Sequence, residues 1–325
     1  MSRPPVGTLI PIGGYKVGDI LNSNQFEVIP SSIPWTKSVY ARDLAIDSNK
    51  NIYVYDINDD GHITKYTDEG IEVWQIIGWR EVHGSSRIDI DSNDNLYVVI
   101  TYGDYYLYKL SSVNGNEIWR TQYEFPNQVR DVKVGKDDYI YVATSSNRLY
   151  KYDADGNEIW EAILGGHQAL YTATADSNGY VYAGHWDGSL YKLDADGNQI
   201  WKKFGGGTGS TAIKAISIDS NNNVYFSKDS SNLCKMSSEG IELWTYTGHT
   251  RGINTIIIDD LTMKIYSGSD DKTIRKLNND GVELQVIEEE GTIFSLVFDG
   301  EYLYGAIGGV NGFKKYSSQK IKIIA

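Results

Sequence analysis

The chain repeats one sequence pattern along most of its length, and this repetition limits the folds that it can adopt. Residues 149–160 read LYKYDADGNEIW and residues 190–201 read LYKLDADGNQIW, so only two of the twelve positions differ. A tryptophan marks the end of the pattern in five copies, at Trp74, Trp119, Trp160, Trp201 and Trp244. A period of about 41 residues is typical of architectures in which each repeat is one supersecondary unit.

Two further copies keep the frame without the tryptophan. Gln285 and Ile324 stand at the marker position in these copies, so the sequence predicts seven units. In the last unit, residues 321–324 (Ile-Lys-Ile-Ile) are expected to form the outer strand.

Each unit contains four short runs that are rich in β-branched and aromatic residues. In one unit these runs are 170–176, 180–185, 189–194 and 198–204, and Asp, Asn and Gly separate them. Such runs are typical of hairpin-linked strands, and four antiparallel strands repeated radially form the blades of a propeller. No helical period extends over ten or more residues. The predicted fold is therefore all-β, a seven-bladed β-propeller of four-stranded antiparallel blades over residues 39–325.

Residues 1–38 lie outside the repeat and hold five of the six prolines of the chain. This composition predicts an extended N-terminal arm rather than a second domain. The run Gln25–Ile29 is a candidate edge strand for a blade. Two partners for the arm stay open at this stage, its own propeller and another subunit.

Charge and composition narrow the classes of partner. The net charge of −13 disfavours nucleic acid and anionic membrane surfaces, which bind clustered Lys and Arg. No run of 18 apolar residues predicts a membrane span, and no secretory signal is visible, so we expect cytoplasmic synthesis or association with a particle. Cys234 is the single cysteine, which excludes an intrachain disulfide.

The strand pattern with a tryptophan near the end of each unit resembles the PQQ-like repeat of bacterial propellers. Residues 248–277 resemble a WD40 repeat, with a Gly-His opening and Ser-Gly-Ser-Asp before the third strand, although Leu277 stands where that family has a tryptophan. Quinoprotein dehydrogenases have eight blades, paired cysteines and calcium ligands. Seven units and one cysteine depart from that pattern, so we expect no PQQ and no other cofactor.

The histidines are the candidates for chemistry. His83, His167 and His249 fall between blades, while His62 and His185 lie near turns that join second and third strands, and these two kinds of loop share one face. One hypothesis is a metal or catalytic site, which would make the chain a propeller lyase or hydrolase with a histidine base at the channel mouth. The other is that His167 and His249 brace turns, as the resemblance to WD40 repeats implies.

The segment Asp56–Gly61 resembles the opening of a calcium loop. Its candidate ligands are Asp56, Asn58 and Asp60. The closing glutamate of such a loop is missing, because Thr67 stands there, and Asp-Gly is also an ordinary hairpin turn.

One face of the predicted disc varies from blade to blade and is rich in aromatic and basic residues. Such residues dominate protein interfaces, and aromatic faces also stack on sugars. The candidate binding residues are Trp79, Arg80, His83, Tyr102, Tyr105, Phe125, Arg130, His185, Trp186 and Arg251. The sequence thus predicts a non-enzymatic scaffold that binds a protein or a glycan, for example as a structural or attachment component of a phage virion or tail-like particle.

Overall fold

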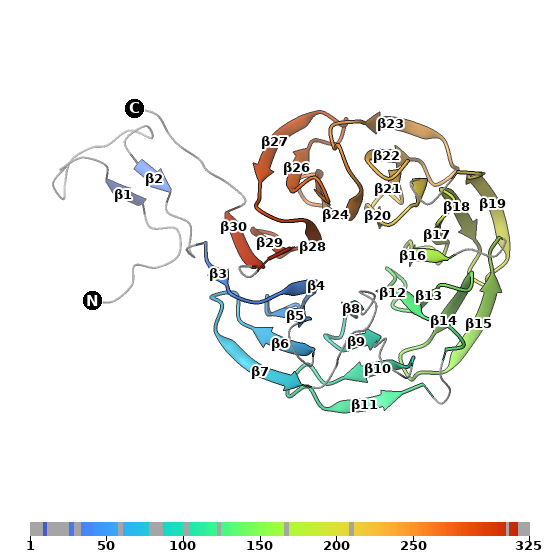
Figure 1. Ribbon diagram of the computed structural model, residues 1–325, viewed down its shortest axis with the longest axis horizontal. Helices are drawn as coiled ribbons and strands as arrows, with labels where there is room; N and C mark the ends of the chain where they lie inside the picture. Colours follow the sequence, from blue (N-terminus) through green and yellow to red (C-terminus); the bar gives the residue numbers. More distant parts are fainter. Residues whose placement is uncertain are drawn as a thin grey trace.

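The computed structural model of the chain is a ring of seven radial β-sheets (Figure 1). It describes residues 9–11, 26–28, 34–57, 61–77, 87–99, 105–121, 125–165, 169–207, 211–309 and 312–317. These residues form seven four-stranded antiparallel sheets and one two-stranded sheet, and no α-helix occurs among them. The predicted all-β seven-bladed propeller is confirmed.

Within each blade the strands run in order from the central axis to the rim. Blade one contains β4 (Ala41–Ile46), β5 (Ile52–Asp56), β6 (His62–Tyr66) and β7 (Glu72–Ile77). Blade two contains β8 (Arg87–Ile90), β9 (Leu96–Val99), β10 (Leu107–Leu110) and β11 (Glu117–Arg120). Blade three contains β12 (Val129–Val134), β13 (Ile140–Thr144), β14 (Arg148–Tyr152) and β15 (Glu158–Ile163).

The next three blades repeat this order. Blade four contains β16 (Leu170–Ala175), β17 (Val181–His185), β18 (Ser189–Leu193) and β19 (Gln199–Phe204). Blade five contains β20 (Ile216–Ile218), β21 (Val224–Lys228), β22 (Asn232–Met236) and β23 (Glu242–Tyr246). Blade six contains β24 (Ile253–Asp259), β25 (Lys264–Ser269), β26 (Thr273–Leu277) and β27 (Glu283–Glu288).

Blade seven joins the two ends of the chain. It contains β28 (Ile293–Phe298), β29 (Tyr302–Ile307), β30 (Phe313–Ser317) and, at its outer edge, β3 (Thr36–Lys37). The sequence had assigned this edge to residues 321–324, which lie outside the described residues, and had begun the propeller at residue 39. The outer strand is instead β3, because Trp35 and Thr36 bring to this edge the same contacts that the fourth strand makes in other blades.

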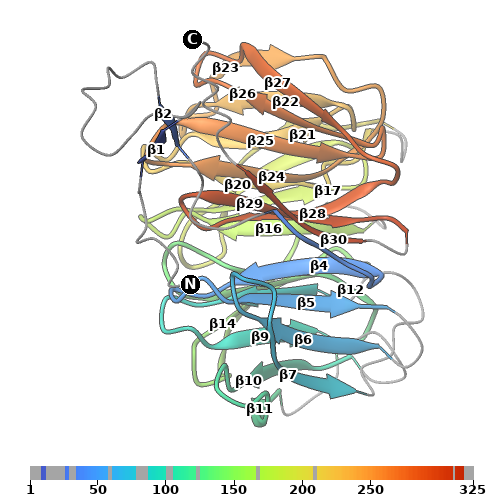
Figure 2. The ribbon, with the colours of Figure 1, turned by 90° about the vertical axis from the view of Figure 1, so that its left-hand side faces the viewer.

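Burial follows the position of a strand in its blade. The second strands, such as β5 and β17, are buried along their whole length, because neighbouring blades cover both of their faces. The fourth strands alternate between exposed and half-buried residues, because their outer side faces solvent. When the disc is seen from its side, the strands lie one above another across its width (Figure 2).

The half-buried marker tryptophans connect each blade to the next one. The Nε1 of Trp74 donates to the carbonyl of Ser112, and Trp119 and Trp160 donate to the corresponding carbonyls of Ala154 and Ala195. Each acceptor lies in the turn between the third and fourth strands of the following blade, here called the outer turn. The predicted wedging of the tryptophans between blades is therefore confirmed.

Trp35 is the marker of blade seven. Its Nε1 donates to the carbonyl of Asp68 in the outer turn of blade one at 3.0 Å, and its ring packs on Phe313. The sequence had placed Ile324 at this position. Trp35 occupies it because β3 comes from the other end of the chain, and this contact closes the ring.

A lysine recurs at the same place on the third strand of every blade. The seven lysines lie within 5.5 Å of the ring centroid of a tyrosine on the second strand of the same blade. They are Lys65, Lys109, Lys151, Lys192, Lys235, Lys276 and Lys315. Lys65 also donates to Ser112, the carbonyl that accepts from Trp74, so two donors from one blade share one acceptor on the next.

The turns between the first and second strands, here called the inner turns, are near copies of one another. In blade one Asp47 accepts from the N–H groups of Asn49 and Asn51 and from the Tyr53 hydroxyl. Burial by itself would raise the pKa of Asp47, but hydrogen bonds from Asn51 and the Lys65 ammonium hold it below its usual value. Asp91 and Asp219 repeat these contacts in blades two and five.

The remaining part of the N-terminal segment forms its own small sheet. β1 (Leu9–Pro11) pairs antiparallel with β2 (Phe26–Val28). A strand was expected near Gln25–Ile29, and one occurs there, but its partner is β1 rather than a blade.

Replacement of Trp35 by alanine tests the closure of the ring. We expect Trp35→Ala to lower the free energy of unfolding by about 2–4 kcal/mol, since it removes a packed indole and the hydrogen bond to Asp68. Trp35→Phe keeps most of the ring and should cost less. Urea unfolding followed by circular dichroism measures both. Val113→Ala, at a side chain that is 80% exposed, is the control, and an equal effect of Trp35→Ala and the control would contradict the assignment.

A pair of glycines tests the contact between a tryptophan and an outer turn. Gly197 has φ of +86°, and a Cβ there would lie 2.9 Å from the Trp160 ring. Gly300 has φ of +89° with no atom within 4 Å of such a Cβ. Both alanine variants carry the same backbone strain, so Gly197→Ala should be less stable than Gly300→Ala by about 1–3 kcal/mol. Equal unfolding midpoints would show that the indole does not restrict this turn.

Candidate binding face and central channel

The two faces of the disc differ in what the chain places on them. All inner and outer turns lie on one face, here called the turn face, because the strands of each blade alternate in direction. The opposite face, here called the loop face, carries the connections between second and third strands and those between blades. The six described members of the sequence-predicted binding set, Tyr105, Phe125, Arg130, His185, Trp186 and Arg251, come from the loop-face ends of their blades.

The described members of that set have different environments. Trp79, Arg80, His83 and Tyr102 lie outside the described residues. Trp186 is partly exposed and Arg251 is exposed, so both are available on the loop face. Tyr105 is half-buried against the core between blades two and three.

Phe125 and His185 belong to the interior and not to the surface. Phe125 is 4% exposed and packs edge-on against Tyr150, with ring centroids 5.1 Å apart. His185 is 2% exposed, and its ring nitrogens lie 2.7 Å from Asp187 and 3.2 Å from Asn147. Both residues were expected on the binding face because they are near loops, but their side chains turn inward and fill the core.

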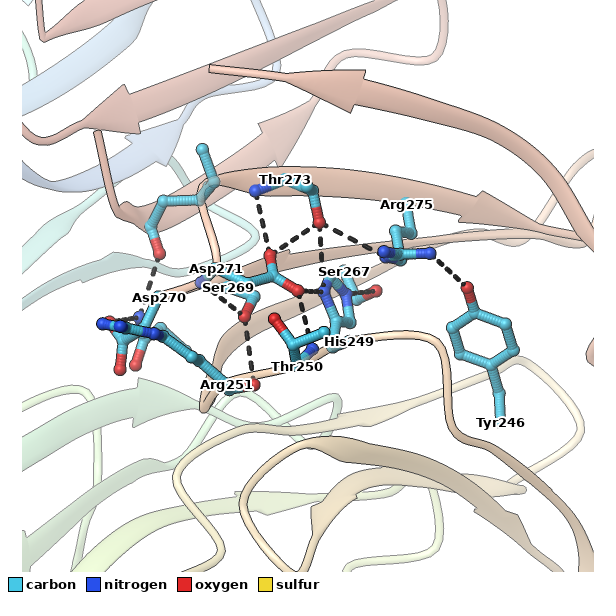
Figure 3. A network of polar contacts seen from close by, with 12 residues as sticks. Tyr246, His249, Thr250, Arg251, Ser267, Ser269, Asp270, Asp271, Thr273 and Arg275 are labelled. Carbon is cyan, nitrogen blue, oxygen red and sulfur yellow. Dashed lines mark hydrogen bonds and ion pairs between the residues drawn. The ribbon is translucent and has the colours of Figure 1, made fainter. Parts of the chain in front are cut away.

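His249 sits in a buried polar network in blade six (Figure 3). Its Nδ1 lies 2.9 Å from Asp271, and its Nε2 lies 2.8 Å from the hydroxyl of Ser267. Burial lowers the pKa of His249, so its ring is neutral at pH 7. An ionised Asp271 can only accept, so Nδ1 carries the proton and Ser267 donates to Nε2.

The network continues from His249 toward the rim of the blade. The hydroxyl of Thr273 donates to Asp271 at 2.6 Å and accepts from Arg275. Arg275 in turn donates to the Tyr246 hydroxyl and pairs with Glu283. This series of contacts ties the loop that enters blade six to its second, third and fourth strands.

Three of the five histidines considered for a metal or catalytic site, His62, His185 and His249, lie within the described residues. His83 and His167 lie outside the described residues, and His185 and His249 belong to separate blades with separate aspartate partners. Among the residues that the structure describes, no group of three His, Cys, Asp or Glu side chains could hold a metal ion. Of the candidate calcium ligands, Asp56 is buried at the end of β5, and Asn58 and Asp60 lie outside the described residues.

The first strands of the blades surround a central cavity of about 530 Å³. Near its loop-face end each described first strand presents a residue five positions before the inner turn. Six blades contribute Arg42, Arg130, Tyr171, Lys214, Asn254 and Phe294 in this way. Arg87, one position further along in blade two, lines the same end.

Of these channel residues, only Arg130 was predicted from the sequence as a binding residue. A signal was present, since alignment of the copies on the inner turn shows five residue types at this position in six blades, with Arg in blades one and three, while the tyrosine and lysine positions do not change. Deeper in the channel, burial raises the pKa of Asp131 to about 6, although the positive charges of Lys133 and Arg87 oppose this.

An ion pair spans the channel at its turn-face end. Lys136 from the inner turn of blade three lies 3.1 Å from Asp260 in the inner turn of blade six. These blades stand on opposite sides of the ring (Figure 1), so the ion pair crosses the channel. The turn-face end of the channel is therefore bridged by a salt bridge.

Fold and repeat chemistry together define the class as a seven-bladed propeller of PQQ-like repeats. Residues 59–263 match the family described as outer membrane protein assembly factor BamB. This match covers more than half of the chain, so the chain belongs to this family of propellers. No protein of curated function matches the sequence. No helix within the described residues has the length and apolar character needed to cross a membrane.

Because His249 is neutral in the fold, we expect the stability of the protein to fall as the pH is lowered. Its pKa is lowered on folding, so its contribution to stability is complete above the unfolded value of about 6.5 and is lost as the pH falls below it. Asp271, whose pKa is lowered to about 2, adds a loss only below about pH 4. We expect the free energy of unfolding of the wild type to fall between pH 7 and pH 5, and that of His249→Gln to fall less.

Urea titrations at pH 7, 6 and 5 measure this difference. His62→Gln replaces a histidine outside the network and serves as the control for the loss of an imidazole. If His249→Gln and His62→Gln show the same slope, His249 is not held neutral by the fold.

Proposed function

We propose that the chain is a non-enzymatic scaffold that binds a protein partner through its loop face. One observation carries the proposal: at the equivalent position around the channel mouth, six blades present five different residue types, although the blades are otherwise close copies. The fold needs the repeated Asp, Tyr, Lys and Trp contacts, but it does not require this variety. The variety therefore favours recognition of something outside the ring.

The type of residue at the loop face supports a protein partner. Arginine, tyrosine and tryptophan are enriched at interface hot spots, and Arg130, Tyr171 and Trp186 lie on or near this face. The turn face offers mainly short aspartate, asparagine and serine turns whose polar groups already bond to one another. The family description names an assembly factor, and a role in bringing other proteins together suits a rigid ring of this kind.

The alternative of a hydrolase has one feature in its favour, since Asp271, His249 and Ser267 have the order of contacts of a catalytic triad. A nucleophilic serine must reach its substrate, but Ser267 is 0% exposed and His249 is 4% exposed. We therefore assign the network to bracing the loop between blades five and six, as the resemblance of residues 248–277 to a WD40 repeat implied.

Two finer hypotheses from the sequence concern a glycan ligand and a place in a virion or tail-like particle. Because Trp35 and β3 belong to the ring, a tether function of the N-terminal segment would fall on residues before Trp35. Affinity capture tests the glycan hypothesis, since capture of a glycan and no protein would contradict the proposed protein partner.

Affinity capture with loop-face variants tests the proposal. The intact chain is immobilised and compared with a variant that carries Trp186→Ala and Arg251→Ala. We expect the double variant to retain less than about a tenth of the specifically bound protein, since truncation of two hot-spot residues costs several kcal/mol. Quantitative mass spectrometry of the bound fraction measures the ratio.

The control for this capture lies on the turn face. Leu261→Ala removes a side chain that is 89% exposed in the inner turn of blade six and should leave capture unchanged. Thermal unfolding of all three proteins excludes a loss of fold. Equal capture by both variants, or loss with Leu261→Ala alone, would move the interface away from the loop face.

A further inference from the structure

The central channel has an excess of positive charge inside an acidic protein. The chain has a net charge of −13, yet the described channel wall contains six cationic and four acidic residues. The cationic residues are Arg42, Arg87, Arg130, Lys133, Lys136 and Lys214. Cations gathered in a cavity repel one another, so the reason for their placement lies either in acidic partners within the wall or in a ligand.

Most of the acidic side chains of the wall are occupied by the protein itself. Asp43 accepts from the backbone N–H groups of Leu44 and of Ile88 in the next blade, each at 3.0 Å. Asp89 accepts from Val134 at 2.9 Å in the same way. Asp270 accepts from the side-chain amide of Asn254 at 2.8 Å. These carboxylates hold neighbouring first strands together.

The cations at the two ends of the channel differ in whether they form ion pairs. Lys133 lies 3.9 Å from Asp89, and Lys136 lies 3.1 Å from Asp260 near the turn face. For Arg130 and Lys214, at the loop-face end, no ion pair is formed with any residue that the structure describes. Two cations that form no ion pair in the described structure, Arg130 and Lys214, therefore lie at the channel mouth.

One hydrogen-bond donor of Arg130 has no acceptor in the described structure. Its Nε is buried and has no hydrogen-bond partner within the described structure. The guanidinium carbon lies 5.5 Å from the centroid of the Tyr171 ring on the next blade, which limits the orientations that the group can take. A buried donor on a charged group without an acceptor is costly, and an incoming acceptor would remove that cost.

We propose that the channel mouth binds a carboxylate group between Arg130 of blade three and Lys214 of blade five, beside Tyr171 of blade four. A guanidinium matches the two oxygens of a carboxylate, and a lysine ammonium adds a point charge. The remaining wall offers the hydroxyl of Ser295 for a further polar contact, while the hydroxyl of Thr172 already bonds to Asp131. The bound carboxylate supplies the acceptor that Arg130 lacks.

The cavity limits the ligand that carries this carboxylate. A volume of about 530 Å³ is in the range of sites for small molecules or for a few residues of a peptide. The modest excess of charge suits one to three carboxylates rather than a long polyanion. The source is thus a small free acid or an acidic peptide side chain, and the inference does not depend on the protein partner proposed for the loop face.

Calorimetric titration of the full-length protein at low salt tests this site. The probes are citrate, an acetylated tetraglutamate peptide and inorganic phosphate. We expect saturable binding of citrate or of the peptide, and about tenfold weaker binding by Arg130→Gln and by Lys214→Gln. Arg120→Gln removes the same charge from an exposed position on the outer strand β11 and should leave the affinity unchanged.

The pattern of binding among the three probes identifies the class of ligand or overturns the proposed site. Binding of citrate identifies a free acid as a sufficient ligand, and binding of the peptide alone identifies an acidic segment. Phosphate binding as tight as either carboxylate probe, no saturable binding by the wild type, or equal affinity of the Arg130→Gln, Lys214→Gln and Arg120→Gln variants overturns the proposal. Thermal unfolding checks the fold of each variant, and Lys214→Gln decides the matter if Arg130→Gln does not fold.

Discussion

The ring depends on the contact between a tryptophan and a lysine of one blade and the outer turn of the next. In blades one, two and seven both side chains donate to a single carbonyl, that of Ser112, Ala154 or Asp68. Two donors on one acceptor define the distance and angle between adjacent sheets. Because the lysine is largely buried, it also needs the neighbouring tyrosine ring and the inner-turn aspartate to balance its charge.

Because of this contact, the sequence of the turn face is constrained by the junctions between blades, and the sequence of the loop face is not. Its acceptors and the inner-turn aspartates lie on the turn face, where changes in sequence would break junctions between blades. The opposite ends of the first strands are not part of the junctions, so they can carry different side chains around the channel mouth. The positions that vary among blades are thus the positions that the repeat leaves free, and both proposals for this protein depend on them.

Much of the architecture could be predicted from the repeat, but the closure of the ring could not. The marker search found Gln285 in register, and it pairs with Lys276 as the tryptophans do with their lysines. Gln285 lacks an indole, and no hairpin turn joins the third and fourth strands of blade seven for it to contact, since those strands come from opposite ends of the chain. Trp35 was overlooked because its blade partner, β30, lies almost a whole chain length away.

The sequence by itself determined the number of blades, the strand order within each blade and the packing of the tryptophans, since these follow from a short period and from local turns. The tertiary structure decided which loop residues reach the surface, that Phe125 and His185 are buried, and that Arg130 and Lys214 face one cavity. Such properties depend on the direction of a side chain relative to other blades. That direction is fixed only when the ring closes and brings residues from distant repeats together.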